Sequence, residues 1–269
     1  MQTTTATLAD IAALIMDMDG VLWRGSEPLP GLNAFFDFLH AQDIPYAMAT
    51  NNSSKSVAEY MAKLAGFGVE VPPERIITSA VATARYVQKQ KPGARVHVVG
   101  MPGLSQTMRD YGLTVADSDV DYVIVGIDWE VTYAKLAVAT RLVRQGATLI
   151  GTNPDLTFPT AEGINPGAGS LIAAVEAASE QRAIVIGKPN RALFEMAIEA
   201  VGTPPARTAM LGDRLETDIL GAQRAGLRTI LVCTGIHTRA DLPASEVQPD
   251  FVFDDLPDLL RQWRAVYAH

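Results

Sequence analysis

Short apolar runs alternate with amphipathic segments from one end of this 269-residue chain to the other. Strands that alternate with helices pair in parallel, because each helix carries the chain back to the edge of the sheet where the next strand begins. We therefore predict an α/β fold with mainly parallel strands. The expected strands are Ala12–Met16, Pro45–Ala49, Arg75–Thr78, Arg95–Val99, Tyr122–Val125, Thr148–Gly151, Ala183–Gly187, Thr208–Leu211, Thr229–Val232 and Phe251–Phe253.

Two polar segments interrupt this alternation and mark candidate domain boundaries. Gln88–Ala94 contains Pro-Gly among polar side chains, and Ser179–Arg182 precedes the strand expected at Ala183. The segments enclose about 90 residues with strands and helices of their own, which suits a small domain. We predict that residues 91–182 form an inserted α/β domain, and that residues 1–90 and 183–269 together form the main domain.

The acidic balance of the chain limits its partners. The formal net charge is −8, whereas duplex nucleic acid and anionic membrane surfaces select basic patches. The first residues lack the basic start and long apolar stretch of a secretory signal, and no window approaches the roughly 20 apolar residues that span a bilayer. We expect a cytoplasmic protein that binds neither nucleic acid nor membrane.

Four groups of polar residues follow predicted strands, and the first is Asp17-Met18-Asp19-Gly20. The carboxyl ends of the strands form the edge where open α/β sheets bind their ligands. Two carboxylates in unlike surroundings can divide nucleophilic attack and proton transfer between them, which makes Asp17 and Asp19 candidate catalytic residues. The alternative is a turn at the end of the strand without a catalytic role.

The second and third groups are suited to anion binding. Thr50-Asn51-Asn52-Ser53 lies between a predicted strand and a helix, where hydroxyl, amide and backbone N–H groups bind anions. Lys188 follows the strand Ala183–Gly187, where its ammonium would balance a phosphate and a carboxylate. The alternatives are simple helix capping for the first segment and a solvated loop lysine for the second.

The fourth group is Gly212-Asp213-Arg214-Leu215-Glu216-Thr217-Asp218, which follows Thr208–Leu211. Magnesium prefers oxygen ligands and keeps several waters, so one or two protein carboxylates and the substrate oxygens are enough to hold it. Asp213 and Asp17 together meet this need. Asp218 has an alternative role, because a carboxylate in the first turn of a helix interacts favourably with the helix dipole.

The order of the four groups resembles the motifs of the haloacid dehalogenase (HAD) superfamily. The resemblance extends from Leu14 to about Asp254 and is closest to the type IIA members, the p-nitrophenylphosphatase-, nucleotide-monophosphatase- and pyridoxal-phosphate-phosphatase-like proteins. The matching segments are Gly126-Ile127-Asp128, Thr132-Tyr133 with Lys135-Leu136, Gly151-Thr152-Asn153-Pro154-Asp155, Pro166-Gly167-Ala168-Gly169-Ser170 and Gly187-Lys188-Pro189.

This resemblance implies a Rossmann-like parallel-sheet core with an inserted α/β cap domain. It also implies a magnesium-dependent phosphatase that hydrolyses small phosphate monoesters through an aspartyl-phosphate intermediate. Asp17 would be the nucleophile and Asp19 the general acid/base. The phosphoryl group would be bound by Thr50, Asn51, Asn52 and Lys188. Mg²⁺ would be held by the side chain of Asp17, the main-chain carbonyl of Asp19 and Asp213, with Asp218 behind them.

Several alternatives stay open. A phosphotransferase or phosphomutase shares all four motifs, whereas a dehalogenase would need neither Asp19 nor Asp213. A phospho-acceptor signalling module is disfavoured, because the acidic motif follows the lysine here and the chain is about twice as long as a receiver domain. Candidate substrates include nucleoside monophosphates, sugar phosphates, phosphoglycolate and pyridoxal phosphate. A homodimer formed through the cap is another arrangement that the sequence leaves open.

The resemblance further implies a substrate-specificity loop at Asn153–Pro159. This segment follows a predicted strand and contains two prolines, which limit the entropy lost when a ligand binds. We expect its aromatic residue, Phe158, to discriminate between leaving groups. The alternative is that Phe158 packs within the cap.

Overall fold

The computed structural model describes residues 7–160 and 163–267, without the side chains of residues 158–160. The chain divides into two compact units. The first takes its described residues from Met1–Ala49, Met61–Ile77 and Phe194–His269, and the second from Thr50–Tyr60 and Thr78–Leu193. The predicted inserted domain, 91–182, falls within the range of the second unit, and its exact limits stay a prediction.

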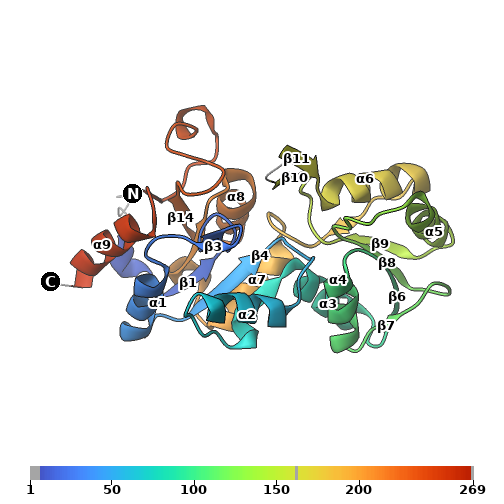
Figure 1. Ribbon diagram of the computed structural model, residues 1–269, viewed down its shortest axis with the longest axis horizontal. Helices are drawn as coiled ribbons and strands as arrows, with labels where there is room; N and C mark the ends of the chain where they lie inside the picture. Colours follow the sequence, from blue (N-terminus) through green and yellow to red (C-terminus); the bar gives the residue numbers. More distant parts are fainter. Residues whose placement is uncertain (1–6, 161–162, 268–269) are drawn as a thin grey trace. The chain divides into compact units, whose positions relative to one another are not determined.

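A six-stranded sheet organises the first unit (Figure 1). In β1, all four residues are fully buried, because β13 and β4 pair with it in parallel on either side. β13, β14 and β15 continue the sheet in parallel. In spatial order the strands are β15 (Phe251–Phe253), β14 (Arg228–Val232), β13 (Thr208–Gly212), β1 (Ala13–Met16), β4 (Tyr46–Thr50) and β5 (Ile76–Thr78). A short antiparallel hairpin, β2 (Trp23–Arg24) with β3 (Glu27–Pro28), follows β1.

Helices surround this sheet. On α9 (Leu256–Tyr267), the buried residues Leu256, Leu259, Leu260 and Trp263 recur at helical spacing. The Trp263 ring packs against α1 (Leu32–Ala41), with its centroid 5.6 Å from that of Phe38. The remaining helices are α2 (Val57–Gly66), α7 (Arg191–Val201) and α8 (Leu220–Arg224), and the first residues of α2 and α7 belong to the second unit. The short helical turns are η1 (Leu8–Asp10), η2 (Pro73–Arg75), η3 (Pro205–Arg207), η4 (Leu215–Ile219) and η5 (Leu242–Ala244).

The second unit has a parallel sheet of its own. Its core consists of buried strand residues such as Val123 and Leu149, packed against Leu142 and Ile172 of the covering helices. In spatial order the strands are β12 (Ile184–Val185), β9 (Thr148–Gly151), β8 (Tyr122–Val125), β6 (Arg95–Val99) and β7 (Thr114–Val115). The helices are α3 (Ser79–Gln90), α4 (Pro102–Asp110), α5 (Tyr133–Arg144) and α6 (Ala168–Ser179), and a hairpin joins β10 (Thr157–Thr160) to β11 (Gly163–Pro166).

These elements confirm the predicted α/β fold. All ten expected strands are present, and their ends differ from the prediction by at most two residues. The prediction of a loop at Asn153–Pro159 is wrong for its second half, because Thr157 begins β10, which pairs with β11 in antiparallel fashion. The side chain of Phe158, on which the specificity hypothesis depends, lies outside the described side chains.

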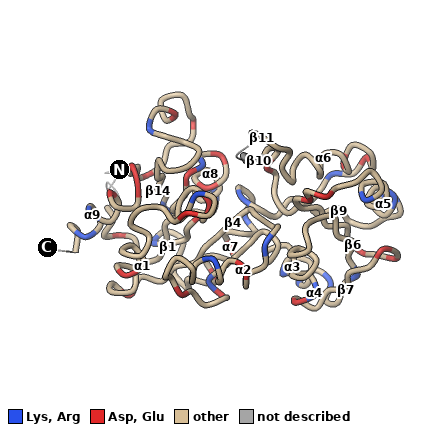
Figure 2. The backbone as a smooth tube through the Cα atoms, in the orientation of Figure 1, with Lys and Arg blue, Asp and Glu red and all other residues tan. Residues whose placement is uncertain are grey.

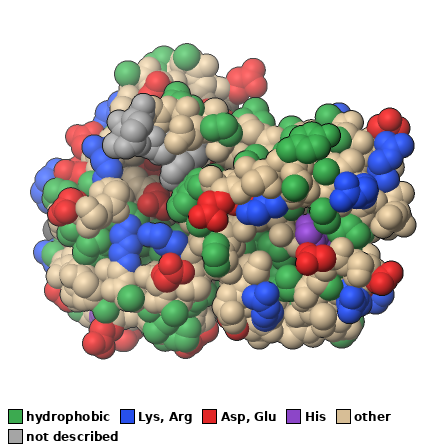
Figure 3. All heavy atoms as spheres, turned by 45° about the vertical axis from the view of Figure 1, so that its right-hand side comes forward, with side chains coloured by type: hydrophobic (Ala, Val, Ile, Leu, Met, Phe, Trp, Pro, Cys, Tyr) green, Lys and Arg blue, Asp and Glu red, His purple; other side chains and the backbone are tan. Residues whose placement is uncertain are grey.

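Charged residues are distributed over both units. Basic residues lie on many separate elements (Figure 2), and acidic and basic side chains are interspersed on the face drawn in Figure 3. That face therefore presents no continuous basic surface in the part of the chain that is described. Among the helices within residues 7–160 and 163–267, none is long and apolar enough to cross a bilayer.

Candidate active site

Two of the predicted acids meet where neighbouring strands end. Asp17 follows β1 and Asp213 follows β13, and these strands are paired in parallel with Met16 opposite Leu211. The pairing continues one residue further, because the N–H of Asp17 donates to the carbonyl of Leu211 at 2.8 Å. The sheet register therefore brings two residues that are far apart in sequence to the same edge.

Asp218 joins them from η4, a wide helical turn that follows β13. Its Oδ2 accepts hydrogen bonds from the backbone N–H groups of Asp213, at 3.3 Å, and Arg214, at 3.1 Å. One carboxylate oxygen from each of Asp17, Asp213 and Asp218 lies within 4.8 Å of the other two. The three residues are only 8%, 3% and 1% exposed, respectively. We call these three residues the acidic cluster.

The acidic cluster has the properties of a cation site. Three carboxylates that are close together and withdrawn from water repel one another, so the ionised cluster needs a compensating positive charge. Carboxylate oxygens are the ligands that Mg²⁺ prefers. The side chains of Asp17, Asp213 and Asp218 therefore fit a hard divalent cation, and Asp218 lies near enough to the other two to belong to the same site.

Two glycines allow the backbone to approach Asp213 closely. Gly20 has a φ of +86°, and a Cβ there would lie 2.6 Å from Asp213 Oδ2. A Cβ at Gly235 would overlap the same oxygen, which also accepts a hydrogen bond from the N–H of Ile236 at 2.8 Å. Gly235 and Ile236 cannot be recognised from sequence as part of this site, because Ile236, for example, lies 23 residues from Asp213 along the chain.

Asp19 lies outside the acidic cluster. It is exposed, and its Oδ1 accepts a hydrogen bond from the indole N–H of Trp23 at 2.7 Å. The intervening turn is fixed by a hydrogen bond of 2.6 Å from the hydroxyl of Thr234 to the carbonyl of Gly20. The two acids of the first motif therefore have unlike surroundings. Their roles as nucleophile and proton donor stay a prediction.

In the second unit, Asn51 holds the main chain of Lys188. Its Oδ1 accepts a hydrogen bond from the N–H of Lys188 at 2.7 Å, and its Nδ2 donates to the carbonyl of the same residue at 3.0 Å. Lys188 is 2% exposed, so the predicted alternative of a solvated loop lysine is wrong. The amide of Asn51 thus determines the position of the backbone from which the Lys188 side chain extends.

Asn51 is itself held by the segment that follows β9. Its Nδ2 also donates to Asp155 Oδ2 at 3.2 Å, and its carbonyl accepts from Asn153 Nδ2 at 2.8 Å. The hydroxyl of Ser79 donates to the same carbonyl at 2.6 Å. The second and third motifs and the Asn153–Pro159 segment are therefore parts of one hydrogen-bonded network in the second unit. In the sequence they are separate segments, more than 100 residues apart for Asn51 and Asn153.

Thr50 and Asn52 use their side chains to form a turn. Thr50 Oγ1 accepts from the N–H of Asn52 at 3.1 Å, and Asn52 Oδ1 accepts from the N–H of Ser54 at 2.8 Å. Ser53 is fully buried, with its hydroxyl 3.2 Å from that of Thr152. These bonds are of the kind expected for the turn and capping alternative. Phosphate binding by Thr50 and Asn52 stays a prediction.

Comparisons with known proteins bear on what such a site does. A family model described as haloacid dehalogenase-like hydrolase matches residues 14–114, and one described as HAD-hydrolase-like matches residues 185–259. An acid sugar phosphatase of Staphylococcus aureus is 38% identical over 251 residues, which cover 93% of this chain and 97% of that protein.

Two solved structures extend the comparison to the fold. The crystal structure of 4-nitrophenylphosphatase from Thermotoga maritima has a TM-score of 0.91 and 37% sequence identity, covering 94% of this chain and 98% of that one. The p-nitrophenyl phosphatase from Archaeoglobus fulgidus has a TM-score of 0.90 and 31% identity, covering 94% of this chain and 99% of that one.

Proposed function

Because this chain belongs to the haloacid dehalogenase-like hydrolases and is a phosphatase, we propose that it hydrolyses small phosphate monoesters through a phosphorylated Asp17. The observation that carries this proposal is the buried acidic cluster at the ends of β1 and β13, which contains Asp17, with Asp19 two residues further along the chain. The names of the relatives make sugar phosphates the natural substrate class to test first, and p-nitrophenyl phosphate the natural reporter.

The proposed reaction has two displacements at phosphorus. In the first, a carboxylate oxygen of Asp17 attacks phosphorus, the bond to the leaving-group oxygen breaks, and Asp19 gives its proton to that oxygen. In the second, Asp19 takes a proton from a water molecule, whose oxygen attacks phosphorus and displaces Asp17. The products are an alcohol and inorganic phosphate, and both acids return to their starting forms.

Asp17, the main-chain carbonyl of Asp19 and Asp213 would hold Mg²⁺, with Asp218 behind them. When bound, the ion would supply positive charge against the charge that develops on the phosphoryl oxygens. We propose that Thr50, Asn52 and Lys188 bind the phosphoryl group. The side-chain amide of Asn51 is hydrogen-bonded to the main chain of Lys188 and to Asp155. We propose that Asn51 acts by holding the main chain of Lys188 in place.

The direct test is a hydrolysis screen with p-nitrophenyl phosphate and a panel of sugar phosphates and nucleoside monophosphates. We expect activity with Mg²⁺, its loss in EDTA and its return when Mg²⁺ is restored. An Asp17→Asn variant, tested in parallel, should be inactive on every substrate. Full activity in thoroughly metal-stripped protein would contradict the proposed mechanism.

The same screen separates hydrolysis from phosphoryl transfer, which uses the same four motifs. With p-nitrophenyl phosphate and an added excess of a sugar, a hydrolase releases inorganic phosphate and p-nitrophenol in equal amounts. A transferase passes part of the phosphoryl group to the sugar, so phosphate would fall short of p-nitrophenol. We expect equal amounts.

A further inference from the structure

Asp19 forms a hydrogen bond with Trp23, a residue that has no role in the reaction proposed above. The indole N–H of Trp23 donates to Asp19 Oδ1 at 2.7 Å, although Trp23 is fully buried and Asp19 is exposed. A buried tryptophan normally finds an acceptor for its N–H, so packing explains that a bond exists. Packing does not explain why the acceptor is Asp19, the carboxyl group proposed to transfer protons. A hydrogen bond to an ionised carboxylate is about twice as strong as one between neutral groups.

The backbone between the two residues is closed into a tight loop. The N–H of Gly20 donates to the carbonyl of Trp23 at 2.8 Å, and Asp19 and Trp23 form an isolated bridge. Arg24, the next residue, donates through its guanidinium to the carbonyl of Thr234. These contacts bring Trp23 back next to Asp19, and they are separate from the hydrogen bond between the indole and the Asp19 carboxylate.

The Trp23 ring is held from its other side by residues of α2 and the turn that follows it. Lys63 Nζ lies 4.1 Å from the centroid of the ring, a cation–π distance, and also donates to the carbonyl of Gly25 at 2.8 Å. The Phe67 ring packs against Trp23 with centroids 6.1 Å apart. Rotation of the indole would break these contacts, so the direction of its N–H is well defined.

We infer that Trp23 is a positioning residue for proton transfer, which it controls by fixing the orientation of the Asp19 carboxyl group. The inference rests on the proposed function of Asp19. Since Oδ1 accepts the indole N–H, the proton that Asp19 transfers is carried on Oδ2. That proton passes to the leaving-group oxygen as its bond to phosphorus breaks and the bond between phosphorus and Asp17 forms.

The role predicts an effect that depends on the leaving group. A p-nitrophenolate ion is stable and departs with little protonation, whereas a phenolate without the nitro group is more basic and depends on the acid. A misoriented Asp19 therefore slows reactions with basic leaving groups and spares those with stable ones. General structural damage would slow all of them alike.

The experiment measures kcat/KM for p-nitrophenyl, phenyl and p-methoxyphenyl phosphate, three substrates of similar shape. For Trp23→Phe, we expect a loss of about tenfold with p-methoxyphenyl phosphate, part of the acid's full contribution, and less than about twofold with p-nitrophenyl phosphate. Asp19→Asn should show the same trend more strongly. Phe38→Leu, which loosens the packing around Trp263 but keeps Lys63 and Phe67 against the Trp23 ring, should lower all three rates by the same factor.

The variants distinguish the positioning role of Trp23 from the proposed acid role of Asp19. A uniform loss in Trp23→Phe beside a graded loss in Asp19→Asn would overturn the positioning role and leave the proposed function intact. A uniform loss in Asp19→Asn would overturn the acid role of Asp19 itself. If Trp23→Phe does not fold, as judged by its thermal unfolding, Lys63→Met removes a contact that fixes the ring and should give a weaker graded loss. A uniform loss in Lys63→Met would then count against the inference.

Discussion

Asp17 and Asp19 differ in their surroundings in the way that the two proposed roles require. Asp17 is 8% exposed and lies among the other acids of the acidic cluster, where a bound cation would favour its ionised, nucleophilic form. Asp19 is exposed and bonded to Trp23, outside that cluster. A group that exchanges protons with both leaving group and water needs access of this kind.

The first prediction separates these roles. Asp17→Asn should lower kcat by at least about three orders of magnitude while leaving the fold intact, because the amide keeps the shape of the carboxylate but cannot attack phosphorus. Asp19→Asn should slow both displacements and can allow phosphorylated enzyme to accumulate. Intact mass after mixing with substrate and quenching in acid measures the intermediate. A phosphate adduct on Asp17→Asn would refute the assignment of the nucleophile.

At the scale of elements, the sequence predicts those parts of the fold that depend on local pattern. Apolar or β-branched residues predominate in β6, β8, β9 and β15, and the limits of these strands are predicted to the residue. The pairs β2–β3 and β10–β11 were missed because two-residue strands have no periodicity and because β10 and β11 contain proline or glycine. Each strand of these hairpins is recognised only by its pairing with the other strand in the folded protein.

The candidate active site likewise contains some features that the local sequence predicts and others that depend on contacts between distant segments. The positions of Asp17 and Asp213 at strand ends follow from sequence, since a polar residue directly after a buried strand marks the edge of the sheet. The contacts of Asn51 with Asn153 and Asp155 do not, because they join positions 102 and 104 residues apart. Only the folded second unit brings those residues together.

The second prediction tests this network. Asn51→Ala removes three hydrogen bonds, which at about 0.5–1.5 kcal/mol each should lower the free energy of unfolding by about 1.5–4.5 kcal/mol. It should also lower kcat/KM by about tenfold or more, because a small displacement of a positioned group such as Lys188 is costly. Urea unfolding and kinetics with p-nitrophenyl phosphate measure the two effects. Asn33→Ala, at an exposed position of α1, is the matched control and should change neither.

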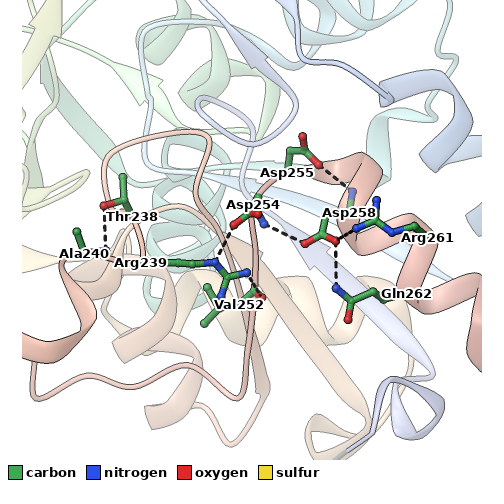
Figure 4. Close-up of polar contacts among 9 residues, drawn as sticks. All are labelled: Thr238, Arg239, Ala240, Val252, Asp254, Asp255, Asp258, Arg261 and Gln262. Atoms are coloured by element: carbon green, nitrogen blue, oxygen red, sulfur yellow. Dashed lines mark hydrogen bonds and ion pairs between the residues drawn. The ribbon is translucent and has the colours of Figure 1, made fainter.

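The third prediction concerns the start of α9 (Figure 4). There the pKa of Asp258 is lowered, first by the hydrogen bond of 3.0 Å from the side-chain amide of Gln262, and further by the N–H of Asp254 and the charge of Arg261. A lowered pKa means that the ionised carboxylate stabilises the fold. This contribution is complete above the unfolded pKa of about 3.9 and is lost as the pH falls below it towards the folded value.

We therefore expect Asp258→Asn to lower the free energy of unfolding at pH 7, and the difference from wild type to shrink steadily below about pH 4. Gln262→Ala, which removes the largest cause of the shift, should reduce the same pH dependence. Denaturant unfolding followed by tryptophan fluorescence provides the measurement, since Trp263 lies fully buried on the same helix. A difference that is the same at pH 7 and pH 3 would show that the carboxylate contributes only through packing.

At the scale of the whole molecule, residues with proposed roles occur in each of the two compact units. The first contains the acidic cluster and Asp19, and the second contains Asn51, Lys188 and the Asn153–Pro159 segment. The alternation of strands and helices is enough to predict two parallel sheets. It does not indicate that residues 50–60 and 78–90 belong with the second unit, because membership depends on packing between distant segments.

The last prediction uses the stability of the molecule to test the metal site without reference to catalysis. A ligand that binds only the folded state stabilises it by about 2.7 kcal/mol when present at about 100 times its Kd. For a chain of this size, that corresponds to a rise in Tm of about 5–10 °C. We expect Mg²⁺ to produce such a rise in wild type after metal is stripped with EDTA.

The Asp213→Asn variant should lose this rise in Tm, because it removes one of the three charges that attract the ion. The variant without metal should melt at or above the temperature of metal-free wild type, since fewer carboxylates then repel one another, while the amide oxygen can still accept the N–H of Ile236. Asp37→Asn, on the exposed face of α1, is the matched control and should keep the full Mg²⁺ shift. An equal shift in Asp213→Asn and wild type would place the ion elsewhere in the protein.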